Sequence, residues 1–184
     1  LNNDTVVDPG FLAPLIDALR DPWTGISVPK ILYMDDPGRI WYAGGIVNPL
    51  TGTIAHRGIR IPDGPEFGIA GPTRYATGCC LCIGADDFRK LGGFDESFQM
   101  YGEDVDLSLK MRQTGRIVWY EPASRIWHRV SVSAGGERRH DFPCLQNEGR
   151  RHLVRRPCPS HALGKDRCVH RGIGRGLRKP VEGA

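Results

Sequence analysis

Three groups of polar side chains, far apart along the chain, carry the chemistry that this sequence could perform. They are the corner Asn2-Asn3-Asp4, the pair Glu103-Asp104 and the lone His128 that follows Trp127. Carboxylate and amide oxygens suit a hard cation such as Mg²⁺, and an added imidazole nitrogen shifts the preference toward Mn²⁺. A carboxylate held in a cleft can also accept the proton of a hydroxyl group. The sequence therefore predicts a divalent-cation site and a general base.

The corner Asn2-Asn3-Asp4 is the first candidate site. Asp4 precedes a predicted helix, and we expect it at the carboxyl end of a strand, where open α/β sheets place their ligands. An oxygen-rich corner of this kind could hold a cation that carries a diphosphate. The alternative is local, because Asn and Asp side chains also form Asx turns and helix caps.

The Glu103-Asp104 pair opens the clearest predicted helix of the chain. Its local alternative is the helix dipole, which favours carboxylates at a helix N-terminus. Asp106, four residues before Lys110, has a similar alternative as a helix-surface ion pair. The aromatic, glycine-containing approach over residues 98–102 distinguishes Asp104, since such a loop can bring a carboxylate into a cleft.

His128 ends a predicted apolar strand, and a lone histidine in that position can be a structural residue. As a ligand it would complete a mixed nitrogen and oxygen site with Asp4. The serines at 131 and 133 and the glycines at 135–136 could line a phosphate-binding turn or form a flexible exit.

The elements that position these residues alternate between strands and helices. The predicted helices span residues 8–19, 86–91 and 103–114, and the predicted strands span residues 25–32, 39–47, 53–55, 75–83, 117–120 and 125–127. We expect Asp8 to cap the first helix, which Pro14 could kink or delay. A hairpin turn is expected at residues 48–52 and a mobile, functional loop at residues 56–72. The pattern predicts an α/β fold with helices on both faces of the sheet.

Composition predicts one soluble domain, or most of one. The 184 residues are 40% hydrophobic and 25% charged, and no apolar run approaches the roughly 18 residues of a membrane span. We therefore expect a cytoplasmic chain or a cytoplasmic piece of a larger protein. Because the chain lacks an initiator Met, we also expect an N-terminal truncation.

The basic character of the chain belongs to its end. Residues 137–184 hold 12 Lys and Arg against 5 Asp and Glu, whereas residues 1–136 hold 13 against 16. With little apolar periodicity, this tail is predicted to be solvated or poorly ordered, and nucleic-acid binding is not expected without interleaved aromatic residues. The cysteines and histidines of the tail match no compact zinc motif, while the cysteines at 79, 80 and 82 are predicted to be buried free thiols.

Residues 1–136 resemble, in order, the family 2 glycosyltransferases of the GT-A fold, particularly the rhamnosyltransferase-like branch that builds bacterial surface polysaccharides. The matching segments are residues 1–5, 25–32, 43–45, 77–79, 93–96, 100–107 and 127–128, with 131, 133 and 135–136. The resemblance implies a mixed, mainly parallel sheet flanked by helices. It also implies that the nucleotide-binding units of the family precede this chain, so that the fragment alone is not expected to be active.

The resemblance assigns a role to each candidate residue. Asn2, Asn3 and Asp4 would stand in the family's Asp-x-Asp motif, with Asp4 as the carboxylate contact to Mn²⁺ or Mg²⁺ and His128 as a further metal ligand. Thr77 and Gly78 would contribute backbone beside the transferred sugar. Asp104 would be the general base, and Glu103 would orient the acceptor or the base.

The implied reaction is an inverting transfer from a nucleotide-diphosphate sugar to a glycan or lipid-linked acceptor, with peripheral membrane association left open. The alternative is a non-catalytic sugar- or nucleotide-binding module on the same fold.

Overall fold

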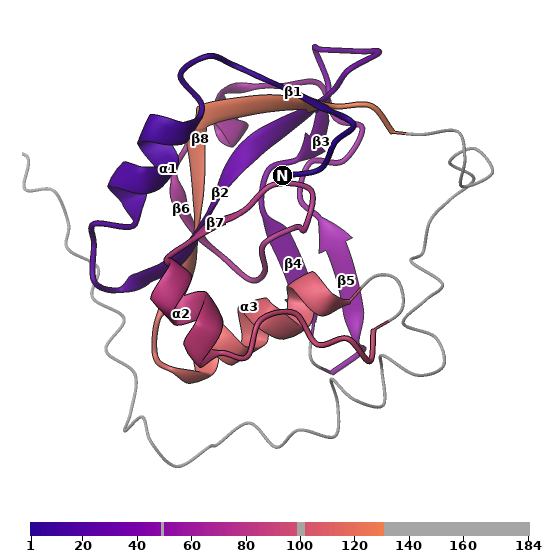
Figure 1. Ribbon diagram of the computed structural model, residues 1–184. Helices are drawn as coiled ribbons and strands as arrows, with labels where there is room; N and C mark the ends of the chain where they lie inside the picture. The colour runs from indigo at the N-terminus through magenta and orange to yellow at the C-terminus, as the bar shows by residue number, and fades with distance from the viewer. Residues whose placement is uncertain (49, 99–101, 131–184) are drawn as a thin grey trace, which may run out of the picture.

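Strand β2 (Thr24–Tyr33) lies at the centre of the sheet in the computed structural model, which describes residues 1–48, 50–98 and 102–130 (Figure 1). Strand β8 (Ile117–His128) runs parallel to it along its whole length. Ile26, Val28 and Ile31 of β2 are completely buried. A strand covered on both faces is buried along its length, and β2 is buried from Thr24 to Leu32, including the polar Ser27 and Lys30.

The remaining strands of this sheet are short and antiparallel to their neighbours. Strands β1 (Thr5–Val7) and β6 (Gly71–Thr73) pair with β8, whereas β3 (Ile40–Tyr42) and β7 (Cys82–Ile83) pair with β2. The predicted α/β class and the mixed sheet are confirmed. The expectation of a mainly parallel sheet is corrected for the described residues, in which β2 and β8 form the parallel pair and the other pairs are antiparallel. Parallel pairing requires a long crossover, and a short connection such as that from β2 to β3 permits only an antiparallel return.

The predicted hairpin is confirmed as a separate ribbon of β4 (Gly45–Asn48) and β5 (Thr53–His56). The single strand expected at residues 39–47 divides into β3 and β4. The chain bends at Gly44, whose φ of 109° is a left-handed conformation that favours glycine. The bend carries the hairpin away from the main sheet, to the lower right of Figure 1.

Three α-helices occur in the part of the chain that the structure describes, α1 (Leu12–Ala18), α2 (Ala85–Lys90) and α3 (Glu103–Gln113), together with a short 3₁₀ helix, η1 (Pro65–Phe67). Helix α1 starts later than predicted, and Asp8 is not its cap. The Asp8 carboxylate instead accepts a hydrogen bond from the Gly10 N–H at 3.0 Å and so forms an Asx turn before the helix. Pro14 thereby falls in the first turn, where no backbone N–H is needed.

Two strand predictions were wrong in extent. Most of residues 75–83 is buried but irregular, because the Gly78 N–H donates to the Asp104 carboxylate instead of a neighbouring strand. The two strands expected at residues 117–120 and 125–127 are one strand, β8, with a bulge opposite Pro29 and Lys30. Strand β1 was missed because three residues carry no readable periodicity.

The loop at residues 56–72 is present as predicted, but it is anchored to the sheet. The Lys30 ammonium, which is buried, contacts the Asp63 carboxylate at 2.8 Å. The Arg57 side chain donates to the Ala43 carbonyl at 2.6 Å, and the buried backbone carbonyl of Phe67 accepts from the Tyr120 hydroxyl at 2.8 Å. These contacts hold the loop on β2 and β8 and oppose the mobility that the sequence predicted.

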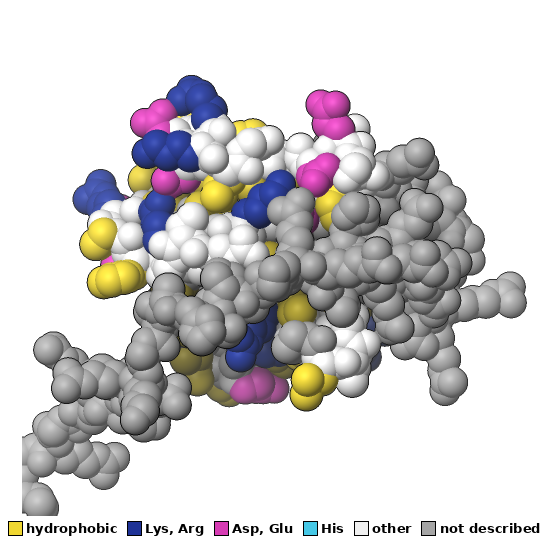
Figure 2. Space-filling view, turned by 90° about the horizontal axis from the view of Figure 1, so that it is seen from below, with side chains coloured by type: hydrophobic (Ala, Val, Ile, Leu, Met, Phe, Trp, Pro, Cys, Tyr) yellow, Lys and Arg dark blue, Asp and Glu magenta, His cyan; other side chains and the backbone are white. Residues whose placement is uncertain are grey.

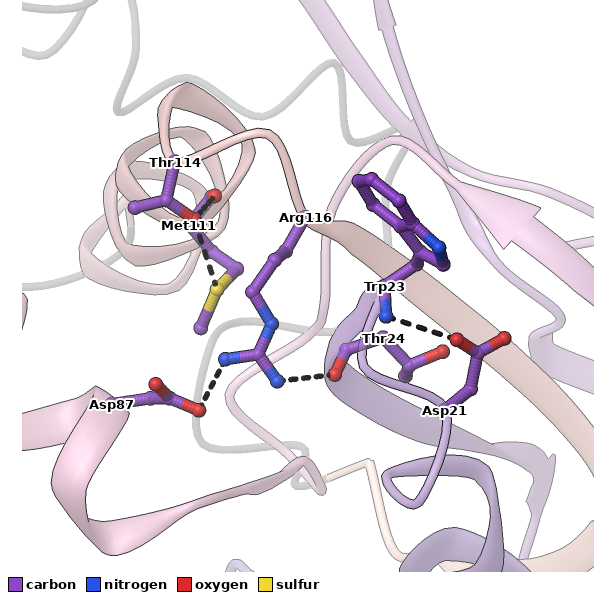
Figure 3. A network of polar contacts seen from close by, with 7 residues as sticks. All are labelled: Asp21, Trp23, Thr24, Asp87, Met111, Thr114 and Arg116. Carbon is purple, nitrogen blue, oxygen red and sulfur yellow. Dashed lines mark hydrogen bonds and ion pairs between the residues drawn. The ribbon is translucent and has the colours of Figure 1, made fainter.

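Arg116 connects helix α2 to the start of strand β2. Its guanidinium donates to the Asp87 carboxylate on α2 and to the Thr24 carbonyl at the start of β2 (Figure 3). These two contacts of Arg116 hold helix α2 against the N-terminal end of β2. The predicted ion pair within α3 is also present, with Lys110 at 2.7 Å from Asp106.

The described surface carries mixed charge. On the face that Figure 2 shows, acidic and basic side chains are interspersed with apolar ones. Across residues 1–48, 50–98 and 102–130, no helix combines the length and apolar character of a membrane span. The predicted tail at 137–184, with its histidines and cysteines, and the serines and glycines at 131–136 lie outside the described residues.

Candidate functional site

A pocket of about 460 Å³ contains most of the residues that the sequence singled out. Its lining comes from the N-terminal corner, the β3 and β5 strands, the residues after Tyr75, the start of α3 and the end of β8. Among the lining residues are Asn2, Thr77, Gly78, Glu103, Asp104 and His128. Segments more than 100 residues apart in sequence therefore share one cavity.

The β1–β8 ladder brings Asp4 next to His128. Thr5 pairs with His128, and the Arg129 N–H donates to the Asp4 carbonyl at 2.9 Å. The Asp4 Oδ2 and His128 Nε2 atoms are 3.2 Å apart, within hydrogen-bonding distance of each other. Asp4 lies directly before strand β1, so the expectation that it ends a strand is corrected for the described chain.

The surroundings of this pair fit a divalent cation. Asp4 Oδ1 and His128 Nδ1 are buried and have no hydrogen-bond partner among the described residues. Within the same described part of the chain, no group of three or more His, Cys, Asp or Glu side chains could hold a metal. Two protein ligands are sufficient where phosphate oxygens and water complete the shell, which is the usual arrangement for Mg²⁺.

The other two members of the N-terminal corner differ from each other. Asn2 lines the pocket, and its backbone N–H donates to the Cys79 carbonyl at 2.9 Å. Asn3 is exposed and is not among the lining residues. Of this corner, Asn2 lines the pocket directly, and Asp4 is connected to the pocket through its contact with the lining residue His128.

Asp104 lines the same pocket from the first turn of α3. Its Oδ2 accepts from the Gly78 N–H at 2.8 Å and its Oδ1 accepts from the Val105 N–H at 2.7 Å. Burial raises the pKa of Asp104 to about 6, with a further contribution from the negative charge of Glu103, against the opposing effect of the backbone donors. A carboxylate with that pKa is ionised at neutral pH and still basic enough to accept a proton.

Residues 76–78 are fixed to α3 by a second hydrogen-bonded contact. The Ala76 N–H donates to the Ser108 hydroxyl at 2.9 Å, and that hydroxyl donates to the Asp104 carbonyl at 2.7 Å. Thr77, which is buried, therefore lies between two points of attachment. Glu103 Oε2 is buried without a hydrogen-bond partner among the described residues, in a position to interact with a polar ligand.

The pocket also contains residues that the sequence reasoning missed. Trp41, Ile54, His56 and Tyr75 line it between the two ends. Ile54 and His56 are two residues apart on β5, a spacing that places both side chains on one face of a strand. That spacing could have predicted that Ile54 and His56 share one face of the strand, but not that they line a pocket together with residues of α3 and β8.

The cysteines that accompany this site are free thiols, as predicted. Cys79 and Cys80 are buried and Cys82 is partly buried. Burial raises the pKa of Cys80 to about 11 and raises the pKa of Cys79 further. Neither thiol is therefore suited to act as a nucleophile near neutral pH.

Another pocket, of about 450 Å³, lies beside α1 and β8 and contains none of the predicted site residues. It is lined by Pro14, Asp17, Ala18, Asp21, Thr24, Trp119 and Glu121. Of these two pockets in the described part of the chain, the one of about 460 Å³ is therefore the one that candidate site residues line.

The chain has sequence relatives among bacterial proteins. No protein-family model matches the chain. The chain is 35% identical over 140 residues to the O-antigen biosynthesis protein RfbC of Myxococcus xanthus, a match that covers 72% of this chain and 11% of RfbC. It is 36% identical over 151 residues to the N-acetylglucosaminyl-diphospho-decaprenol L-rhamnosyltransferase of Mycobacterium tuberculosis, covering 73% of this chain and 47% of that protein.

The structural comparison concerns the fold. The structure is similar to the crystal structure of GalNAc-T7 with UDP, GalNAc and Mn²⁺, with a TM-score of 0.51 and 22% identity over 68% of this chain and 26% of that chain. The architecture is thus shared with a GT-A protein. The chain spans about half the length of the mycobacterial relative and a much smaller part of RfbC.

Proposed function

Because this chain belongs with the family 2-like glycosyltransferases of the GT-A fold, we propose that it takes part in moving a sugar from a nucleotide-diphosphate donor to an acceptor hydroxyl with inversion. The observation that supports the proposal most directly is the single pocket lined by both Asp104 and His128, with Asp4 at 3.2 Å from His128.

In the proposed step, the Asp104 carboxylate takes the proton of the acceptor hydroxyl. The hydroxyl oxygen forms a bond to the anomeric carbon from one face of the sugar, and the bond from that carbon to the diphosphate oxygen breaks on the other face. One displacement inverts the anomeric configuration. Glu103, whose Oε2 is buried beside Asp104, would orient the acceptor hydroxyl or the base. Thr77 and Gly78 hold the pocket wall beside the transferred sugar.

Asp4 and His128 would hold a divalent cation at the leaving-group end. Mn²⁺ or Mg²⁺ bound there would stabilise the negative charge of the departing nucleoside diphosphate. The mixed carboxylate and imidazole pair favours Mn²⁺. Asn2, which also lines the pocket, would add a polar side chain near the diphosphate.

The relatives give the proposal a biological setting. One is named for O-antigen biosynthesis and the other for rhamnosyl transfer to N-acetylglucosaminyl-diphospho-decaprenol. We therefore propose that the acceptor is a glycan or a lipid-linked sugar of a bacterial surface polysaccharide. A lipid-linked acceptor would place the protein at the cytoplasmic face of a membrane.

The variant Asp104→Asn tests the proposal against a module that only binds sugar or nucleotide. In the full-length gene product, transfer should fall by about 10²- to 10⁴-fold, the range expected for loss of a general base. Binding of the donor should stay within about twofold, because the cation end is unchanged. Both quantities can be measured with radiolabelled donor and by calorimetry.

Asp86→Asn is the matched control, since the Asp86 side chain is 82% exposed on α2 and lies away from the pocket. It should leave both transfer and binding unchanged. Undiminished transfer in Asp104→Asn would reject Asp104 as the base, and donor binding without any transfer in the wild type would favour the binding module.

A further inference from the structure

Three aromatic rings form one wall of the pocket, between its cation end and its base end. Trp41, His56 and Tyr75 all line the cavity, and we refer to them as the aromatic wall. The ring centroids of Trp41 and His56 are 4.5 Å apart, and those of His56 and Tyr75 are 6.1 Å apart. The wall is thus continuous, with His56 at its centre.

The wall reaches both ends of the proposed reaction site. Trp41 packs edge-on against His128, with ring centroids 4.4 Å apart. At the other side, Tyr75 and Asp104 line the same pocket, and the charge of Asp104 adds to the effect of burial in raising the pKa of Tyr75. The rings therefore extend from the residue that would hold the cation to the residue that would act as base.

The position of the aromatic wall determines which part of the donor would lie beside it during transfer. If the function proposed above is correct, the departing diphosphate lies at the cation end and the attacking hydroxyl lies at Asp104. The anomeric carbon must lie between them, so the ring of the transferred sugar lies beside the aromatic wall. Aromatic side chains present an apolar face of this kind to ligands, and a few polar groups then fix the orientation.

The charged side chains that line the pocket restrict which class of sugar it can bind. Its described lining includes the carboxylates of Asp95, Glu96, Glu103 and Asp104 but no Lys or Arg. An acidic sugar would bring a fifth carboxylate among them without a cationic side chain from these residues to pair with it. Like charges placed together in this way weaken binding strongly.

His56 is the polar member of the wall. Its Nδ1 lies 3.2 Å from the Trp41 carbonyl oxygen. A carbonyl only accepts, so Nδ1 carries the hydrogen and Nε2 of the neutral ring is an acceptor. Burial lowers the pKa of His56 to about 4, and the charge of a protonated His128 would lower it as well, whereas the Trp41 carbonyl opposes this.

We propose that the transferred sugar is a neutral sugar that packs on the aromatic wall, and that His56 determines which neutral sugar is accepted. The inference rests on the proposed function and extends it to the class of substrate. Of the described loop at residues 56–72, which the sequence predicted to be functional, His56 lines this pocket.

The experiment separates the contribution of the sugar from that of the nucleotide. The affinities of the full-length protein for UDP, dTDP and GDP in Mn²⁺ identify the nucleotide. The affinity for a neutral and an acidic form of the same donor is then compared, for example UDP-glucose with UDP-glucuronate, dTDP-glucose with dTDP-glucuronate or GDP-mannose with GDP-mannuronate. The neutral donor should bind at least about tenfold more tightly than its acidic counterpart.

The variants His56→Leu and His56→Gln test the wall itself. His56→Leu should reduce the affinity for the neutral donor relative to the nucleoside diphosphate by about tenfold, and His56→Gln, which keeps a hydrogen-bonding group, should lose less. The affinity for the nucleoside diphosphate should stay unchanged and shows that each variant is folded. Thr53→Ala, at an exposed position of the same strand, should change neither value.

Two results would overturn the inference while leaving the proposed function intact. One is equal binding of the neutral and acidic donors, and the other is an unchanged ratio of donor to nucleoside diphosphate affinity in His56→Leu and His56→Gln. Failure of every nucleoside diphosphate to bind would instead reject the proposed function, and the inference with it.

Discussion

Asp104, which lines the pocket, and Asp4, which contacts the lining residue His128, are carboxylates in opposite surroundings. At the cation end, Asp4 Oδ1 is buried without a hydrogen-bond partner among the described residues, and Oδ2 faces His128. At the base end, both oxygens of Asp104 accept backbone N–H groups, from Gly78 and Val105. Burial nevertheless raises the pKa of Asp104 to about 6.

This difference shows how one residue type can serve two tasks. A carboxylate with an unfilled oxygen beside an imidazole is suited to a cation, which supplies the missing contacts. A carboxylate that is desolvated and held by backbone donors is suited to a proton, because its ionised form is costly but its orientation is fixed. Environment, and not residue identity, separates the two roles.

Removing the carboxylate at the cation end should have the largest effect among the tests of this comparison. In Asp4→Asn, the affinity of the full-length protein for nucleoside diphosphate in Mn²⁺ should fall by about 100-fold, since loss of metal-site groups costs up to that much. In EDTA, wild type and variant should bind equally weakly. Calorimetry with and without Mn²⁺ measures both cases.

The control for this variant is Asp8→Asn, in the Asx turn just after β1, where Asn can make the same backbone contact. It should bind like the wild type. A cation-independent loss of affinity in Asp4→Asn would mean that Asp4 acts through the fold and not through an ion.

The elements that supply the base end could be read from the sequence more completely than those that supply the cation end. Helix α3 has acidic residues in its first turn, basic residues in its last turn and Gly115 beyond it with a φ of 87°. These are local signals of helix start and stop, and the predicted bounds agree with the observed ones within one residue. Asp104 was therefore placed correctly on its element.

The cation end depends on contacts that no local pattern encodes. Asp4 meets His128 through a three-residue strand and a partner more than 100 residues away. The sequence placed Asp4 after a strand, whereas the structure places it before β1. The pairing with His128 was therefore expected from ligand chemistry and from the resemblance, and not from the predicted strand position. Thr77 and Gly78 were likewise placed in a strand, because their apolar neighbours conceal the hydrogen bonds to α3.

The aromatic wall that joins the two ends depends on close packing at Gly45. A Cβ added at Gly45 would lie only 2.1 Å from the Tyr75 ring. Gly45→Ala should therefore lower the free energy of unfolding by about 2 kcal/mol, as overpacking does, and should weaken donor binding by displacing Tyr75. Urea unfolding followed by fluorescence measures the first effect.

Gly71→Ala is the matched control, because a Cβ at Gly71 would meet no atom within 4 Å. Its free energy of unfolding should change by less than about 0.5 kcal/mol. If Gly45→Ala were as stable as Gly71→Ala, the Tyr75 ring would be free to move, and the wall would not be a fixed link between the two ends.

The pKa of Asp104 predicts how transfer depends on pH. The base must be ionised to accept a proton, so kcat/KM at saturating Mn²⁺ should be constant above pH 7 and should fall below about pH 6. At pH 5 the loss should be about tenfold, since roughly one tenth of Asp104 would then be ionised. A profile without a limb between pH 5 and 7 would contradict this assignment.

The smallest expected effect is a displacement of that limb in Glu103→Gln. Burial is the main reason for the raised pKa of Asp104, and the negative charge of Glu103 adds to it, so removing this charge should move the limb to lower pH by less than one unit. The plateau should also fall if Glu103 orients the acceptor, which separates its two effects within one profile. A limb that stays in place would mean that desolvation alone sets the basicity of Asp104. The base end would then differ from the cation end through burial only, without help from the neighbouring carboxylate.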